Sequence, residues 1–158
     1  MIALKAKDVM NRKVLAARDD MTLEELSGFL VEHEISGAPV EDRAGKLVGV
    51  VSVSDLSSTL SQGGRVERDR SSPDYFVHGW EWSLTGEELS RFNVHNGGSF
   101  VRDIMTSTIL SVDEETPVSG VAQRMMEHHI HRLIVTRHAR MTGIVTSSDL
   151  LGLLVERA

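Results

Sequence analysis

The chain has 158 residues, with 41% hydrophobic residues, 25% charged residues and a formal net charge of −6. This composition is typical of a soluble globular protein, and the negative charge argues against general nucleic-acid binding, which needs a basic face. The absence of cysteine excludes disulfides, thiol catalysis and zinc–thiolate sites. No apolar run approaches the length of a transmembrane helix, and the N-terminus lacks the apolar core of a signal peptide, so we expect a cytoplasmic protein with no membrane partner.

The chain contains an internal repeat. Its first copy extends from Asp8 to Leu60 and its second from Asp103 to Leu154, with an offset of 95 residues at the start and 94 after one deletion in a loop. Each copy, at roughly 55 residues, is only marginally large enough to be stable alone. We therefore expect an α/β fold in which two β-α-β-β-α repeats pack together. The expected divisions are residues 1–60 for repeat 1, 61–100 for an insert and 101–158 for repeat 2.

The first repeat predicts a strand, a helix, a two-stranded hairpin and the start of a second helix. Thr22 and Glu25 have capping-box spacing, so the first helix should begin there. It should end before Gly37, because Pro39 is poorly accommodated inside a helix. The strands are expected at residues 14–17, 38–41 and 47–52, the apolar stripe of the helix at Leu23, Leu26 and Leu30, and the start of the second helix at Asp55.

The second repeat predicts the same order of elements. Thr116 is the expected N-cap of its first helix, and Pro117 is suited to the first helical position. Its closing helix is more apolar than the counterpart in repeat 1, which predicts that the last helix is the more buried of the two. The strands are expected at residues 109–112, 133–136 and 141–146, and the closing helix at Asp149.

The segment between the repeats has no counterpart in either copy. It begins as a polar, glycine-containing stretch and then becomes rich in aromatic residues, with a short helix expected at residues 85–92. Aromatic side chains at this density are costly to leave in water, so we expect them to cover an edge of the core or a partner surface. These aromatic residues are Tyr75, Phe76, Trp80 and Trp82.

Polar residues recur where the last strand of each repeat ends and the next helix begins. Ser52-Val-Ser-Asp55 corresponds to Thr146-Ser-Ser-Asp149. Free N–H groups at a helix N-terminus and nearby hydroxyls can bind phosphate oxygens, and a carboxylate can accept both hydroxyls of a ribose. In one copy alone, Ser or Asp here is more simply an N-cap that needs no ligand. The same spacing in two copies favours a ligand site.

The ordered set of motifs resembles the cystathionine-β-synthase (CBS) domain, two of which in tandem form a Bateman module. The motifs are the Asp-x-Met opening of each repeat, Gly37-Ala-Pro-Val40, Gly49-Val-Val-Ser52 and the closing Ser/Thr-x-x-Asp. The resemblance covers both repeats and leaves the insert unexplained. It implies a stand-alone, non-enzymatic regulatory module that requires no cofactor and binds AMP, ADP or ATP, or S-adenosylmethionine, in two clefts. It also implies a homodimer that pairs through its helical faces, and a separate protein target.

The resemblance assigns ligand contacts by position. Asp55 and Asp149 would hold ribose. His131-Arg132 is similar to the phosphate-binding pair of the AMP-activated protein kinase gamma subunit, whereas repeat 1 has Ser36-Gly37 at that place. An Arg fork forms two charge-assisted bonds to phosphate, so the second cleft is expected to be the stronger phosphate site; alternatively, Arg132 only pairs with a nearby carboxylate. The hydroxyl residues near ribose and phosphate would be Ser52, Ser54, Thr146 and Ser148, and the residues around the base Leu15, Ile35, Pro39, Leu110, Ile130 and Leu133.

Other functions have weaker support in the sequence. His128, His129 and His131 form a cluster, but helical neighbours face different ways and the helix should end near Ile130, so no metal site is expected. The motifs of common catalytic sites, such as Gly-x-Ser-x-Gly or a P-loop, are missing, so no enzyme is expected. The main alternative is an interaction protein with empty clefts that acts through its aromatic insert, with Tyr75, Trp80 and Trp82 as the hot spot.

Overall fold

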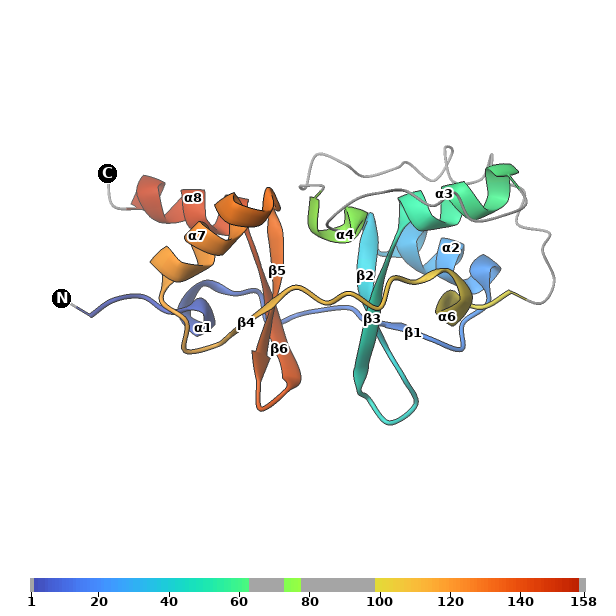
Figure 1. The fold of residues 1–158 in the computed structure, drawn as a ribbon, viewed down its shortest axis with the longest axis horizontal. Helices are drawn as coiled ribbons and strands as arrows, with labels where there is room; N and C mark the ends of the chain where they lie inside the picture. Colours follow the sequence, from blue (N-terminus) through green and yellow to red (C-terminus); the bar gives the residue numbers. More distant parts are fainter. Residues whose placement is uncertain (1, 63–72, 78–98, 157–158) are drawn as a thin grey trace. The chain divides into compact units, whose positions relative to one another are not determined.

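The computed structural model describes residues 2–62, 73–77 and 99–156 (Figure 1). The strand, helix, hairpin and closing helix predicted for each repeat follow one another in that order, which confirms the α/β class. None of the helices in these residues is long and apolar enough to cross a membrane. The helices are α1 (Ala6–Val9), α2 (Leu23–Glu32), α3 (Val53–Gln62), α4 (Asp74–Val77), α6 (Val101–Ile104), α7 (Val118–His128) and α8 (Ser147–Glu156). The strands are β1 (Ala17–Arg18), β2 (Gly37–Glu41), β3 (Leu47–Ser52), β4 (Ser111–Asp113), β5 (Arg132–Arg137) and β6 (Arg140–Thr146).

The described residues divide into two compact units, and neither unit coincides with one repeat. The first-sheet unit holds residues 15–62, 73–75 and 99–109, and the second-sheet unit holds residues 2–14, 76–77 and 110–156. The opening segment of each repeat therefore belongs to the unit that contains the sheet of the other repeat. The predicted boundaries of the repeats and the insert, at residues 60 and 100, stay a prediction.

Each unit contains a three-stranded sheet of the same topology. In the first-sheet unit the order is β1-β2-β3, and in the second-sheet unit it is β4-β5-β6. The first pair is parallel and the second antiparallel in both sheets, and the hairpin register shifts at matching places, between Val40 and Glu41 and between Val135 and Thr136. The duplication seen in the sequence thus extends to the irregularities of the ladder.

The first strand of each sheet differs from its predicted bounds. β1 has only two residues, Ala17 and Arg18, where a strand over residues 14–17 was expected. It pairs with Val40 and Glu41 of β2, and Pro39, the preceding residue of β2, has no N–H to extend the ladder. β4 begins at Ser111, two residues later than predicted, although the carbonyl of Leu110 still accepts the N–H of Ile134 at 3.2 Å.

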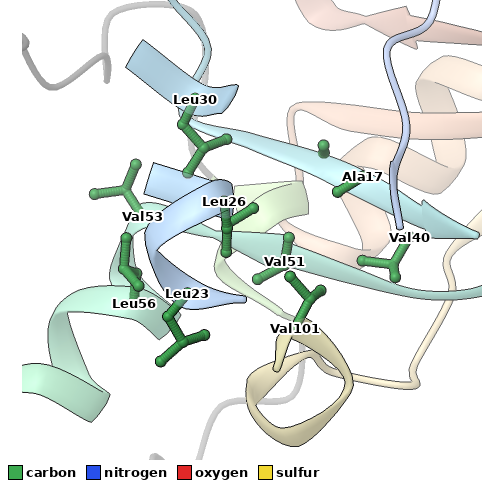
Figure 2. Close-up of a cluster of buried hydrophobic side chains, with 10 residues drawn as sticks. Ala17, Leu23, Leu26, Leu30, Val40, Val51, Val53, Leu56 and Val101 are labelled. Atoms are coloured by element: carbon green, nitrogen blue, oxygen red, sulfur yellow. The ribbon is translucent and has the colours of Figure 1, made fainter. Parts of the chain in front are cut away.

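Helix α2 packs its predicted apolar stripe on the first sheet (Figure 2). The N-cap is Thr22, whose Oγ1 accepts the N–H of Glu25 at 3.1 Å, as the capping-box spacing predicted. Side chains from α2, the sheet, α3 and α6 form one cluster, all at most 3% exposed. The cluster consists of Ala17, Leu23, Leu26, Leu30, Ala38, Val40, Val51, Val53, Leu56 and Val101.

Each repeat opens with a short helix that the sequence patterns did not predict. The N–H of Lys5 donates to Asp8 Oδ2 at 2.8 Å before α1, and the N–H of Phe100 donates to Asp103 Oδ2 at 2.8 Å before α6. A carboxylate at this place satisfies a backbone donor that the helix leaves without a partner. The aspartate of the repeated Asp-x-Met opening is therefore a helix cap.

The methionine of each opening packs on a glycine in the last strand of a sheet, Gly143 in β6 or Gly49 in β3. A Cβ on Gly143 would lie 2.6 Å from Met10 Sδ and 2.8 Å from the carbonyl oxygen of Asn11. A Cβ on Gly49 would lie 3.0 Å from Met105 Sδ, and even closer to a backbone oxygen. Only glycine lets the opening segment approach the sheet this closely.

Helix α7 does not begin as predicted. Its first residue is Val118 and its N-cap is Pro117, so the assignment of Thr116 as N-cap was wrong. The reason lies in the N-terminal segment: the Val118 N–H donates to the carbonyl of Leu4 at 2.9 Å, and the Thr116 carbonyl accepts the N–H of Ala6 at 2.8 Å. A distant backbone segment satisfies the start of this helix in place of a local hydroxyl.

The closing helix is not the more buried one, contrary to the prediction. Helix α8 has no buried residue, and Leu151 and Leu154 are 63% and 68% exposed. In α3, by contrast, Val53 and Leu56 are 3% and 0% exposed. Apolar side chains of α8 line an open groove.

Candidate functional site

The Ser-x-x-Asp motif of repeat 1 forms a capping box at the start of α3. The N–H and the hydroxyl of Ser52 donate to Asp55 Oδ2 at 2.8 and 3.1 Å, and the N–H of Asp55 donates to Ser52 Oγ at 3.4 Å. The helix begins at Val53, two residues earlier than predicted, because Asp55 closes the first turn rather than opening it.

The Thr-x-x-Asp motif of repeat 2 has the same geometry at the start of α8. The N–H and hydroxyl of Thr146 donate to Asp149 Oδ2 at 2.8 and 3.0 Å, and the N–H of Asp149 donates to Thr146 Oγ1 at 3.2 Å. The capping role that the sequence offered as the simpler explanation is therefore present in both copies. The cap uses one oxygen of each carboxylate, so a ligand contact has to coexist with it.

The first residue of each hairpin lies directly beside the cap. Gly37 pairs with Ser52 in the first sheet, and Arg132 pairs with Thr146 in the second. The preceding carbonyls, of Ser36 and His131, accept the N–H of the first residue of α3 and of α8 at 2.8 and 2.9 Å. The predicted correspondence of Ser36-Gly37 with His131-Arg132 thus agrees with the ladder. We call these two places the first junction and the second junction.

The second junction is the more accessible of the two. His131 and Ser148 are exposed, and Arg132, Thr146 and Asp149 are half-buried. This junction brings a guanidinium, an imidazole and hydroxyls into one short stretch of β5, β6 and α8. These are groups that bind phosphate and ribose oxygens.

One neighbour of His131 was not singled out from the sequence. Ser147 Oγ lies 3.4 Å from His131 Nδ1, and the N–H of His131 donates to the carbonyl of Phe76 at 2.8 Å. Ser147 stands inside the Thr-x-x-Asp motif, so its place in the repeat could have suggested it. Nothing in the sequence indicated the contact with Phe76.

The residues expected around the base have varied environments. Ile130 and Leu133, which flank His131-Arg132, are 2% and 0% exposed. Pro39 is buried within β2, whereas Leu15 precedes β1 and is 45% exposed. Ile35 and Leu110 are half-buried. The hydroxyl and carboxylate residues are brought together at each junction, and the base contacts stay a prediction.

An apolar groove of about 1040 Å³ lies on the helical face of the second-sheet unit. Helices α7 and α8 and residues 2–4 line it, and it reaches the second junction only at Ile130, His131 and Ser147. Met126 is 76% exposed beside it. The groove is a hydrophobic surface, chemically unlike a phosphate site.

The alternatives from the sequence can be compared with the part of the chain that the structure describes. Within it, His, Asp and Glu form no group of three that could hold a metal ion. Tyr75 and Phe76 are 4% and 0% exposed, so they are buried as expected and Tyr75 is not an exposed hot spot. Trp80, Trp82 and the helix expected at residues 85–92 lie outside the described residues.

Comparison with known proteins identifies the repeated unit. The family model described as CBS domain matches residues 6–62 and 101–156. The CBS domain-containing protein CBSX1, chloroplastic, of Arabidopsis thaliana is 32% identical over 132 residues, which cover 82% of this chain and 54% of that relative. The chain spans 22% of another relative, the L-aspartate semialdehyde sulfurtransferase of Methanocaldococcus jannaschii.

Solved structures show the same fold. The CBS-pair protein CBSX2 from Arabidopsis thaliana, in complex with AMP, is 23% identical and superposes with a TM-score of 0.67 over 98% of both chains. The CBS domain pair of protein MJ0100, in complex with 5′-methylthioadenosine and S-adenosyl-L-methionine, is 23% identical with a TM-score of 0.67, over 99% of this chain and 100% of the other. The predicted pair of repeats is thereby confirmed as the architecture of the chain.

Proposed function

The chain belongs to the CBS-domain family, and from this premise we propose that it is a non-enzymatic regulatory module that binds an adenosine-containing ligand. The ligand is AMP, ADP or ATP, with S-adenosylmethionine as the alternative, and no further cofactor is needed. Binding shifts the chain between two conformations, and a separate protein target responds to the shift. Such a shift requires that the ligand bind the two conformations unequally.

The geometry of the second junction carries the proposal. Arg132 stands in register with Thr146, whose hydroxyl and N–H already bind Asp149. A guanidinium beside a hydroxyl and a carboxylate suits a nucleotide, because Arg binds phosphate and Asp accepts ribose hydroxyls. The recurrence of the same cap at the first junction supports a ligand site inherited by both repeats.

The solved relatives support the choice of ligand class. CBSX2 was crystallised with AMP, and the MJ0100 pair with 5′-methylthioadenosine and S-adenosyl-L-methionine. Adenine with its ribose ring is common to all three ligands, whereas a phosphate occurs only in AMP. The identity of the group beyond the ribose is therefore the open question, and Arg132 is the residue that should decide it.

Isothermal titration with AMP, adenosine and S-adenosylmethionine tests the proposal. Arg132→Ala should weaken AMP binding at least tenfold, about 1.4 kcal/mol, while adenosine binding changes little. The matched control is Arg140→Ala, since Arg140 is exposed and begins β6 six residues, or about 20 Å, before Thr146.

Two outcomes contradict the proposal at different points. Equal loss of AMP and adenosine binding in Arg132→Ala would refute the phosphate role of Arg132. If none of the ligands produces heat or raises the melting temperature of the wild-type protein, the module is not an adenosine sensor, because a ligand specific for the native state must stabilise it.

We also propose that two copies associate through the apolar groove on α7 and α8. The exposed Met126, Leu151 and Leu154 line an apolar surface that a second, identical surface would cover. The family resemblance predicts pairing through helical faces. A cytoplasmic location and a role as an energy sensor complete the proposed picture.

A further inference from the structure

The first junction differs from the second at one position of the fold. Gly37 and Arg132 hold the same place, because each begins its hairpin and pairs with the residue that caps the following helix. The second repeat has a long cationic side chain at this place, and the first repeat has none. What fills the corresponding space in the first-sheet unit therefore bears on whether that junction can hold a ligand.

The ring of Tyr75 fills that space. A Cβ on Gly37 would lie 2.7 Å from the carbonyl oxygen of Val51, 2.9 Å from Tyr75 Cδ2 and 3.2 Å from the Cα of Ser52. The edge of the ring thus lies on Gly37, where any other side chain would begin, and Gly37 is the residue that pairs with the capping Ser52. Tyr75 is 4% exposed, so it is packed in place.

The exposure of the repeated hydroxyls agrees with this packing. Ser52 and Ser54 are 4% and 9% exposed at the first junction. Their counterparts at the second junction are accessible, with Thr146 half-buried and Ser148 exposed. A ligand could reach the hydroxyls of the second junction directly, whereas those of the first are covered.

We propose that Tyr75, contributed by the insert, closes the first junction, so that each chain binds one adenosine ligand, at the second junction. This inference rests on the proposed function and adds its stoichiometry and location. The two repeats keep the same cap, and the insert makes only one of them a ligand site. Removing the ring should open the first junction and give each chain a second ligand site.

Titration with AMP measures the number of sites. The wild-type protein should bind one AMP per chain, Tyr75→Ala should bind two, and Tyr75→Phe, which keeps the ring, should bind one. A wild-type stoichiometry of two, or a folded Tyr75→Ala variant that still binds one, would overturn the closed first junction. Wild-type protein that binds no AMP contradicts the proposed function itself, so the two failures are distinct.

Photolabelling of the wild-type protein with 8-azido-AMP decides the location without any variant. Label should appear in peptides that contain residues 130–149 and not in those that contain residues 35–55. Label in residues 35–55 overturns the inference even if Tyr75→Ala fails to fold.

Discussion

At the scale of single residues, the cap of the second junction uses the same residues as the proposed ribose contact. Asp149 accepts two hydrogen bonds from Thr146 through Oδ2, so a substitution of either residue weakens the start of α8 as well as any ribose contact. Arg132 lies outside the cap. The adenosine affinity of Arg132→Ala, which is expected to change little, separates loss of a phosphate contact from a weakened helix start.

Glu115 is the residue whose charge depends most clearly on the fold. Hydrogen bonds donated by Lys5 and then Lys7 lower the pKa of Glu115 from 4.5 to about 2, and the hydrogen bond that Lys7 donates to Glu115 raises the pKa of Lys7. The folded state thus favours the carboxylate. The contribution of Glu115 to stability is complete above about pH 4.5 and is lost as the pH falls towards 2.

We predict that Glu115→Gln lowers the free energy of unfolding at pH 7 and that its difference from the wild type shrinks steadily between pH 4.5 and pH 2. Urea unfolding at several pH values measures this. High salt should also shrink the difference, because the groups are exposed. Glu32→Gln, an exposed change at the end of α2, should show no such loss at pH 7. A pH-independent deficit in Glu115→Gln would contradict the role of its charge.

At the scale of elements, the glycines under the opening segments are essential to how α1 and α6 dock. We predict that Gly143→Ala lowers the free energy of unfolding by about 1–3 kcal/mol, because its Cβ would meet Met10 and the backbone of Asn11. Gly152→Ala in α8 has nothing within 4 Å of the added carbon and should raise the free energy of unfolding by about 0.5–1 kcal/mol. Chemical denaturation compares them, and a harmless Gly143→Ala would show that the opening segment does not need this close approach.

The two hairpins use different residues for their left-handed turn positions. The first places Gly45 at φ 79°, whereas the second places His138 and Ala139 at φ 50° and 63°. We predict that Ala139→Gly raises the free energy of unfolding by about 1 kcal/mol, since it relieves this strain. The melting temperature should rise accordingly. Ala44→Gly is the matched control: Ala44 does not have a positive φ, so added flexibility should only destabilise. Equal effects of the two changes would rule out strain at residue 139.

At the scale of the whole molecule, the exposed groove on α7 and α8 makes a prediction about assembly. If two copies cover it, Leu151→Glu together with Leu154→Glu should convert a dimer into a monomer, because charged groups are costly to bury without partners. Analytical ultracentrifugation measures the change. Arg140→Glu, on an exposed hairpin of the same unit, should leave the dimer intact. A wild-type protein that is already monomeric at micromolar concentration would refute the dimer.

Most of the architecture was predictable because it depends on local patterns that occur twice. Leu23, Leu26 and Leu30 recur at helical spacing, and Thr22 caps their helix through a hydrogen bond three residues away. The pairing of Gly37 with Ser52 and of Arg132 with Thr146 follows from the same repeat. These features need only neighbouring residues, or residues of one hairpin, to be determined.

The sequence by itself therefore determined the repeated order of elements, the family and the two capped junctions. Only the tertiary structure decided which surfaces are covered by segments from elsewhere in the chain. The N-terminal segment, rather than Thr116, satisfies the start of α7, the side chains of α8 remain in an open groove, and Tyr75 lies on Gly37. The physical reason is that burial depends on contacts between residues far apart in the chain, which neither periodicity nor motif spacing encodes. Two corresponding motifs can thus differ in exposure to solvent.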